Sequence, residues 1–396
     1  MKRDFMFTSE SVTEGHPDKL CDQIADAILD RFLYADPFSR VVAECAVSNG
    51  ILFIASRFVS QARVDIPEIA RQVISQVGYN REDFNAKTCA IMTSFGELPA
   101  EDYLAVDERD MDDAGIEQVT AKNVVNAFGF ACTHTQAMVP LPIWLAHKLA
   151  RRLASVRLQK QLAYLALDGK TQVAVEFRDR RPFRIHSITL IASTYGRKPI
   201  DLADLKHDLY EQVIEPVFLD EEIKPDGKTN LFINPGGPFI VGGPTLHSGL
   251  TGRKTAMDTY GEYSRHSEAA LSGKDPTRID RVGLYAARYA AKNVVAAGLA
   301  QECEVQLTYT IGQAQPVSIQ VETHGTGRLP DDRLAELVGT HFEFRPAGII
   351  RQFNLRRLPG LLKGHFYRKL AAYGHVGRMD MGLPWETTDK TGLLRE

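Results

Sequence analysis

A strand hairpin flanked by helices recurs three times along this chain, and this pattern constrains the fold more than any other feature. Paired runs rich in β-branched and aromatic residues occupy 40–59, 171–194 and 304–323, each between two segments with the apolar spacing of an amphipathic helix. The hairpins begin near residues 41, 171 and 304, so about 130 residues separate one from the next. The apolar face of a sheet has to be covered, here by the flanking helices. We therefore predict an α+β protein of three similar units, each an antiparallel sheet with helices on one face.

Local signals predict the individual turns and helices. Asn49-Gly50 is a strong signal for a tight hairpin turn, and Pro17 stands at a favoured first-turn position of a helix over 17–35. The apolar face of that helix consists of Leu20, Ile24, Ile28, Leu29 and Phe32. Further helices are predicted at 67–78, 142–159, 201–218, 279–300 and 331–342.

The length of 396 residues is too great for one ordinary core and predicts two or three domains. With the hairpin pattern, this gives domains at 1–107, 119–235 and 236–396, with the chain crossing between them. Linkers are expected at 108–118 and in the Gly/Pro-rich segment 234–252.

Composition excludes several classes of protein. The net charge of -3 speaks against a nucleic-acid coat, and no apolar run approaches the roughly 18 residues that a membrane helix requires. The start of the chain lacks the apolar core of a secretory signal. Five scattered cysteines without a C-x-x-C pair predict reduced thiols rather than disulfides or a zinc site. We expect a cytoplasmic protein that binds neither nucleic acid nor membrane.

Basic residues are concentrated in the segment 250–281. The near-neutral composition of the whole chain does not explain this concentration. Glycines and prolines mark this segment as loops, and its Arg253, Lys254, Lys274 and Arg278 are suited to neutralising a polyphosphate. Asp18 and Asp280 could bridge that polyphosphate through Mg²⁺. The alternative is a solvated charged surface.

The stretch Gly15-His16-Pro17-Asp18-Lys19 stands at the start of the first predicted helix. A helix start offers free backbone N–H groups and a positive dipole end, to which this stretch adds a histidine, a lysine and a carboxylate. A plain helix cap with solvated charges is an equally good interpretation of this stretch alone. The chain has no P-loop and no G-x-G-x-x-G that opens a helix, so neither common nucleotide site is predicted.

Several motifs resemble those of the S-adenosylmethionine synthetase (methionine adenosyltransferase) family. They are FTSESVTEGHPDK, LFINPGGPFIVGGP, GLTGRK, DTYG, SGKDPTRIDR, AARYAAKNVVAAGLA and AAYGHVGR, in order from about Phe7 to Trp385. The resemblance implies three domains in a pseudo-threefold arrangement and a homodimer or dimer of dimers with active sites at the subunit interface. It also implies that a thioether sulfur attacks C5′ of ATP, after which the released triphosphate is hydrolysed to pyrophosphate and phosphate.

The resemblance also implies roles for single residues. His16 would stabilise the leaving oxygen, Phe239 would stack on adenine, and Glu44 would hold K⁺. Asp18 and Asp280 would hold Mg²⁺. The positions matching triphosphate-binding residues are Lys170, Arg253, Lys254, Lys274 and Arg278, together with Asp168. Arg278 replaces the family's usual lysine, which keeps the charge and alters the geometry.

The chain departs from the family where the methionine head would bind. Lys122 to Val125 replace a Gly-Asp-Gln-Gly motif, and SEAAL replaces a glycine-rich run. Acidic or amide groups of the family are replaced by Arg57, Leu98, Asn123 and His247. One interpretation is drift in a weakly functional paralogue or a shifted alignment. The other is an altered acceptor pocket, because Arg57 reverses the local charge and would repel a substrate ammonium.

The sequence therefore predicts an ATP-dependent adenosyltransferase that uses methionine or an altered methionine-like thioether. A non-catalytic ATP-binding partner subunit is the alternative, and the intact His16, Lys170 and Lys274 speak against it.

Overall fold

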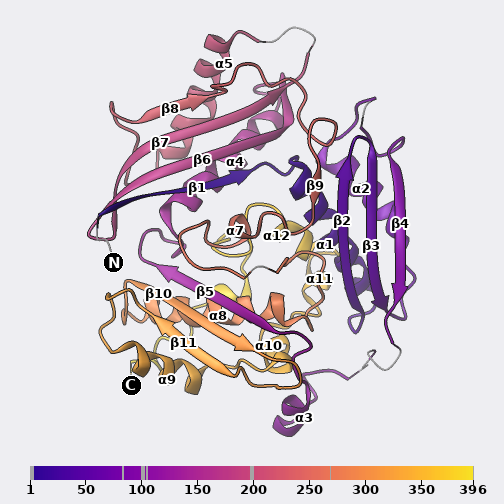
Figure 1. The fold of residues 1–396 in the computed structure, drawn as a ribbon, viewed down its shortest axis with the longest axis vertical. Helices are drawn as coiled ribbons and strands as arrows, with labels where there is room; N and C mark the ends of the chain where they lie inside the picture. The colour runs from indigo at the N-terminus through magenta and orange to yellow at the C-terminus, as the bar shows by residue number, and fades with distance from the viewer. Residues whose placement is uncertain are drawn as a thin grey trace.

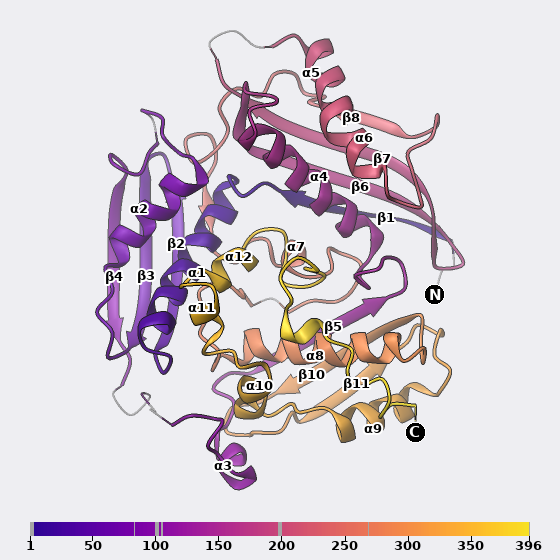
Figure 2. The same cartoon turned by 180° about the vertical axis from the view of Figure 1, so that it is seen from behind.

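The computed structural model describes residues 4–82, 84–99, 103, 106–196, 200–267 and 269–395. Three sheets surround a centre that contains short helices and loops (Figure 1), and the helices pack on one side of the sheets (Figure 2). The predicted α+β fold of three sheet-and-helix units is confirmed. No helix among these residues is both long and apolar enough to cross a membrane.

The first sheet has the order β1-β6-β7-β8. Its long hairpin joins β6 (Leu165–Arg178) to β7 (Arg181–Thr194), with β1 (Phe5–Val12) and β8 (Asn230–Ile233) at the edges. Its helices are α4 (Leu141–Leu158), α5 (Leu202–Leu209) and α6 (Glu215–Phe218). A π-helical segment, η2 (Tyr210–Ile214), joins α5 to α6, so the helix predicted over 201–218 is interrupted.

The second sheet has the order β4-β3-β2-β9. Its hairpin joins β2 (Arg40–Ser48) to β3 (Ile51–Val59), flanked by β4 (Ala90–Glu97) and β9 (Gly249–Leu250). Positive φ angles at Asn49 (47°) and Gly50 (84°) form the predicted tight turn. The helices of this unit are α1 (Pro17–Ala35) and α2 (Ile66–Val77).

The third sheet has the order β11-β10-β5, from Ser318–Glu322, Glu302–Tyr309 and Val125–Cys132. Its helices are α8 (Ile279–Ala296), α9 (Asp331–His341) and α10 (Pro346–Phe353). Short elements complete the chain: α3 (Asp113–Gln118), α7 (Thr255–Asp258), α11 (Leu358–Leu361), α12 (Phe366–Leu370) and the 3₁₀ turn η3 (Pro384–Glu386).

The expectation of purely antiparallel sheets is wrong for two of the units. β4 pairs with β3 in parallel, and β8 pairs with β7 in parallel. Helix α2 stands between β3 and β4 in the chain, and α5 to α6 stand between β7 and β8, so each crossover returns the strand in the same direction. Each sheet also takes one strand from a distant part of the chain, namely β1, β9 and β5.

Helix α1 is buried almost all round, and not only on the predicted apolar face. The other side carries aspartates spaced four residues apart, whose carboxylates accept backbone N–H groups from β9 and the turn after it, from the loop before α8, and from α12. The donors are Leu250 to Asp18 (3.0 Å), Gly252 to Asp22 (2.8 Å), Gly273 to Asp26 (2.8 Å) and Tyr367 to Asp30 (2.9 Å). This acidic row therefore anchors the loops of the 250–281 segment on α1.

Candidate functional site

His16 lies at the N-terminus of α1, where β1 ends and the chain turns into the helix. It is the N-cap residue, and the backbone N–H of Asp18 donates to its Nδ1 at 3.2 Å. A Cβ on Gly15 would lie 2.4 Å from the carbonyl oxygen of Leu167, so only glycine lets the turn pack this closely against β6. Because Nδ1 accepts that hydrogen bond, the proton of a neutral ring sits on Nε2.

Burial is the main cause that lowers the pKa of His16, to about 3. The carboxylate of Asp168 opposes this effect, while His247, Lys170 and Lys254 lower the pKa further. The imidazole is therefore neutral at physiological pH and can donate a hydrogen bond from Nε2.

Asp168, on β6, and His247, on the loop before β9, complete a cluster with His16. Nε2 of His247 donates to Oδ2 of Asp168 at 2.6 Å, and the backbone N–H of Gly243 donates to the same oxygen at 2.9 Å. The ring centroids of His16 and His247 are 4.9 Å apart. Burial acts to raise the pKa of Asp168, but the hydrogen bonds from His247 and from the backbone N–H of Gly243 hold it below its usual range.

The loop cations predicted for this region surround the cluster. Arg253 is half-exposed and lies 3.5 Å from Oδ1 of Asp18, and Lys254 lies 3.4 Å from Glu10. Lys170 is exposed on β6, paired in register with Val12 of β1. The backbone carbonyl of the partly exposed Phe239 accepts a hydrogen bond from Thr194 at the end of β7. His16, Asp168 and His247 with these cations are called the histidine cluster below.

A second group of predicted residues, the lysine cluster, lies at the other end of β2. Nζ of Lys274 is 3.3 Å from Oδ1 of Asp280, and Nδ2 of Asn123 donates to the same oxygen at 2.9 Å. Asp280 is buried in the first turn of α8, and Arg278 is the N-cap residue of that helix. The amide of Asn123 and the ammonium of Lys274 therefore share one oxygen of the Asp280 carboxylate.

Strand register places Arg57 beside the lysine cluster. A β-bridge pairs Lys274 with Val42, and Val42 pairs with Arg57 on β3. Arg57 and Glu44 are both exposed on the same face of this sheet, because Glu44 pairs with Ala55, two residues from Arg57.

Leu98 and Arg278 meet in a cavity of about 210 Å³ near the lysine cluster. Arg40 and Lys122 also line this cavity, with Asp275 as the acidic group. Sequence reasoning did not identify Arg40 as a neighbour of the site, since it lies far from Arg278 in the chain, whereas Lys122 belongs to the altered motif at 122–125.

The two clusters are separate within one chain. The lysine cluster adjoins Val42 and the histidine cluster adjoins β9, which pairs with Val47. Val42 and Val47 are five residues apart on β2, and five strand residues span about 17 Å, so the two clusters lie at opposite ends of this strand. Among the described residues, no hydrogen bond or ion pair joins the two clusters.

Some charges of the 250–281 segment are structural, which the sequence did not indicate. Arg281 is fully buried and forms a bidentate ion pair with Asp26, at 2.8 and 3.0 Å. Lys19, from the predicted helix-start motif, is also buried and contacts Asp22 at 2.9 Å and Asp258. The aspartates four residues apart on α1 are the sequence signal that could have found these partners.

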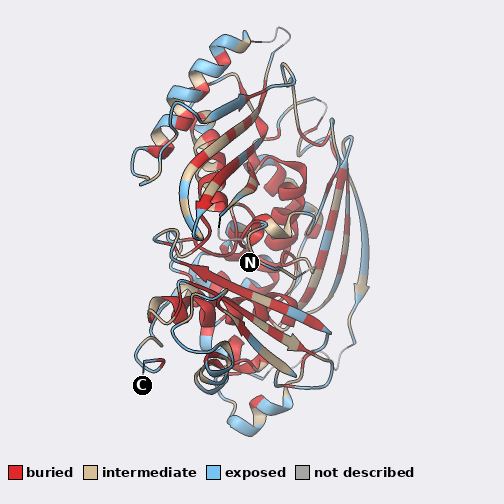
Figure 3. Ribbon diagram, turned by 60° about the vertical axis from the view of Figure 1, so that its left-hand side comes forward, coloured by how far each residue is buried: buried red, intermediate tan, exposed pale blue. Residues whose placement is uncertain are grey.

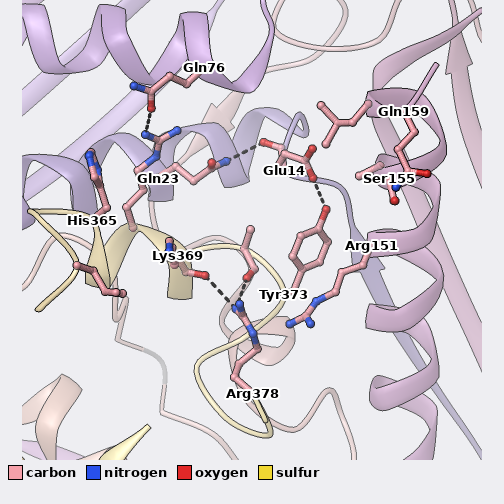
Figure 4. Close-up of a pocket in the computed structure, with 15 residues that line it drawn as sticks. Glu14, Gln23, Gln76, Arg151, Ser155, Gln159, His365, Lys369, Tyr373 and Arg378 are labelled. Carbon is pink, nitrogen blue, oxygen red and sulfur yellow. Dashed lines mark hydrogen bonds between the residues drawn. The ribbon is translucent and has the colours of Figure 1, made fainter. Parts of the chain in front are cut away.

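A cavity of about 680 Å³ is lined by Glu14 and by residues of α4 and of the C-terminal region. None of the predicted site residues lines it. Figure 4 shows hydrogen bonds between several of its side chains, with Tyr373 on Glu14 and Arg378 on backbone carbonyls. Arg157 also pairs with Glu14, at 3.1 Å. Through Glu14 these contacts join α4 to the C-terminal loops.

Comparisons with known proteins match the whole length of the chain. The N-terminal, central and C-terminal domain models of S-adenosylmethionine synthetase match residues 4–99, 118–239 and 241–387. A protein of Synechococcus elongatus named S-adenosylmethionine synthase is 49% identical, with 100% of this chain and 98% of the relative covered. One of the same name from Trichormus variabilis is 50% identical, with 100% and 97% covered. With every domain matched in order and half of the residues shared, this chain belongs to the S-adenosylmethionine synthetase family.

Proposed function

We propose that this protein is an ATP-dependent S-adenosyltransferase. The sulfur of methionine or a methionine-like thioether attacks C5′ of ATP, giving an adenosyl sulfonium and triphosphate, which is then hydrolysed to pyrophosphate and phosphate. The observation that carries this proposal is the buried neutral His16 among Lys170, Arg253 and Lys254. Family membership supports it, and a non-catalytic paralogue is not favoured because these side chains are intact.

The proposed reaction does not require the protein to remove a proton from the nucleophile. A thioether sulfur has no proton to lose, so catalysis consists of aligning sulfur, C5′ and leaving oxygen and of stabilising the charge on that oxygen. Nε2 of His16 is a hydrogen-bond donor for the leaving oxygen, held by the backbone contact at Nδ1. The lysines and arginines of the two clusters neutralise the triphosphate, and Phe239 stacks on adenine.

Asp18 and Asp280 suit Mg²⁺, because each is a buried carboxylate in the first turn of a helix. In the contacts described above, each of them uses only its Oδ1 atom. Their Oδ2 atoms remain to bind a hard cation. Glu44, exposed on the sheet and without an ion pair among the described residues, would hold K⁺. Bound cations would supply charge neutralisation on the phosphates.

We further propose a homodimer, or a dimer of dimers, with the reaction site between two chains. An apolar row crosses the second sheet in register: Leu250, Ala46, Phe53 and Met92. Leu250, Phe53 and Met92 are 44%, 41% and 57% exposed, and Figure 3 shows exposed residues alternating with buried ones along the strands. A second copy packed on this face would bring the lysine cluster of one chain toward the histidine cluster of its partner.

The acceptor pocket is proposed to differ from that for L-methionine. Arg57 lies one strand from Lys274, and the amide of Asn123 donates a hydrogen bond to Asp280. A thioether that carries a carboxylate and no α-ammonium suits this charge distribution better. The unpaired, buried state of all five cysteines is in keeping with the proposed cytoplasmic location.

Product analysis tests the reaction. Incubation with ATP, Mg²⁺, K⁺ and thioethers should yield an adenosyl sulfonium by mass spectrometry, with phosphate and pyrophosphate and without ADP. His16→Ala and Lys274→Ala should each lower turnover by about tenfold or more, since each removes a preorganised charge contact. Lys206→Ala, an exposed lysine on α5, is the matched control and should keep the normal rate. Stoichiometric ADP would exclude this reaction.

A further inference from the structure

The cavity of about 680 Å³ described above lies between α4 and α12, on the helical side of the molecule (Figure 2). Its lining has an excess of positive charge. Among the described residues, Glu14 is its one acidic side chain, whereas its arginines and lysine are Arg151, Arg368, Lys369 and Arg378. We infer that this cavity binds a phosphate monoester, at a site separate from the histidine and lysine clusters of the proposed reaction.

The carboxylates at the cavity are already paired. Glu14 accepts a hydrogen bond from Arg157 at 3.1 Å. Asp380, beside the cavity, accepts hydrogen bonds from Nε and Nη2 of Arg378 at 2.9 and 3.0 Å. Each of these carboxylates therefore offsets an arginine of its own, and the other cations of the lining have no full counter-charge.

The guanidinium of Arg151 is poorly compensated. Its Nε is buried and has no hydrogen-bond partner among the described residues. Its Nη1 lies 3.6 Å from Oδ1 of Asp380, the oxygen to which Nε of Arg378 already donates. Burial, followed by the positive charge of Arg378, holds the pKa of Arg151 below its usual range. An anion at this guanidinium would supply both the missing acceptor and the missing negative charge.

Arg368 and Lys369 bring two further charges from α12. Nη1 of Arg368 donates to the amide oxygen of Gln76, and Lys369 is exposed. Burial holds the pKa of Arg368 below its usual range, although the charge of Asp30 opposes this effect. The carboxylate of Asp30 accepts the backbone N–H groups of Tyr367 and Arg368, each at 2.9 Å. Both cations therefore remain available to a ligand in the cavity.

The arrangement of the donors favours phosphate over carboxylate. Figure 4 shows Arg151 and Ser155 on the α4 side of the cavity and Lys369 across from them. A phosphate monoester carries about two negative charges and three acceptor oxygens, so it can bind donors from several directions. Guanidinium groups match phosphate oxygens through paired N–H donors.

The cavity also has room and apolar surface for the organic part of an ester. Its volume lies within the range of about 300 to 1,000 Å³ that is usual for small-molecule sites. Leu158 and Leu362, which are 62% and 37% exposed, belong to its lining. An apolar group joined to the phosphate would cover these side chains.

Phenyl phosphate is the probe, because it joins a phosphate to an apolar ring and contains neither adenosine nor a thioether. Isothermal titration calorimetry without Mg²⁺ should show saturable binding that weakens as NaCl is added, since salt screens exposed charges. Benzoate should bind about tenfold more weakly or less, and phenol should not bind. Benzoate binding as tightly as phenyl phosphate would overturn the assignment to phosphate.

Two variants change the charge of the cavity without removing an ion pair described above. Ser155→Asp places a carboxylate in its wall, and Lys369→Glu reverses an exposed charge. Each should raise the Kd for phenyl phosphate by about tenfold or more. Lys206→Glu is the matched control, because it makes the same change at an exposed lysine on α5. Unchanged binding by both cavity variants, or equal weakening by all three, would overturn the inference.

Acetylation of lysines, read by mass spectrometry, shows where the probe binds. Phenyl phosphate should protect Lys369 and leave Lys206 as reactive as before. Protection of Lys254 or Lys274 without Lys369 would place the probe in the reaction site and contradict a separate one. No turnover is needed for this measurement, so its outcome does not depend on the proposed adenosyl transfer.

Discussion

At the scale of single residues, His375 shows how a buried network keeps a histidine neutral. Nε of Arg281 donates to the hydroxyl of Tyr285, so the hydroxyl proton points to Nδ1 of His375, at 2.9 Å. Nε2 of this fully buried ring has no hydrogen-bond partner. Burial, with the positive charges of Arg281, Lys19 and Arg378, lowers the pKa of His375 well below 6.5.

This arrangement predicts a loss of stability in acid. The unfolded chain binds a proton at His375 below about pH 6.5 and the folded chain does not, so the free energy of unfolding falls as pH decreases. One proton contributes up to about 1.4 kcal/mol per pH unit. His375→Asn keeps an acceptor for Tyr285 and should flatten the slope between pH 6.5 and 4.5, measured by urea unfolding. His207→Asn makes the same substitution at an exposed position on α5 and is the matched control.

Arg57 decides the charge at the edge of the proposed acceptor pocket. The unaltered protein should use 3-(methylthio)propionate with a higher kcat/KM than methionine, because a lost charge-assisted contact is worth about 1.5 to 3 kcal/mol. Arg57→Glu should move the ratio toward methionine by roughly tenfold or more. Arg63→Glu makes the same charge change at another exposed position and should leave the ratio as it is. A strong preference of the unaltered protein for methionine would mean that Arg57 does not contact the acceptor.

At the scale of elements, β5 and α8 approach so closely that only glycine fits between them. A Cβ on Gly129 would lie 2.0 Å from the carbonyl carbon of Ala287 and 2.1 Å from its oxygen. Neither backbone can yield by rotating a side chain, so the strand and the helix would have to separate.

Gly129→Ala should therefore lower the free energy of unfolding by about 1 to 3 kcal/mol or more, the usual cost of overpacking. Gly227→Ala is the matched control, because a Cβ there would meet nothing within 4 Å. Its unfolding midpoint in urea should stay near that of the unaltered protein. Equal midpoints for both variants would show that β5 and α8 can move apart without cost.

At the scale of the whole molecule, the exposed apolar row on the second sheet predicts self-association. Size-exclusion chromatography with light scattering at micromolar concentration should give at least twice the chain mass of 44.1 kDa. Phe53→Glu places a charge in the middle of the row and should yield monomers with much lower turnover. Leu219→Glu, at a 62% exposed leucine outside the row, should remain associated. A fully active monomer would contradict a site shared between chains.

The sequence by itself determined the local elements of this protein. The hairpins at 40–59 and 171–194, the turn at Asn49-Gly50 and the start of α1 at Pro17 all follow from side-chain spacing and turn chemistry within a few residues. The cationic character of the 250–281 loops was likewise readable from residue types. Such features depend on interactions between neighbours in the chain.

Only the tertiary structure decided which distant segments meet. β4 and β8 join their sheets in parallel because helices carry the chain back, and the pairing of His247 with Asp168 joins residues 79 positions apart. The tertiary structure also gives two arginines of one segment different environments: Arg281 is buried in an ion pair with Asp26, whereas Arg253 is exposed. Desolvation and ion pairing depend on what packs around a charge, and no local pattern contains that information.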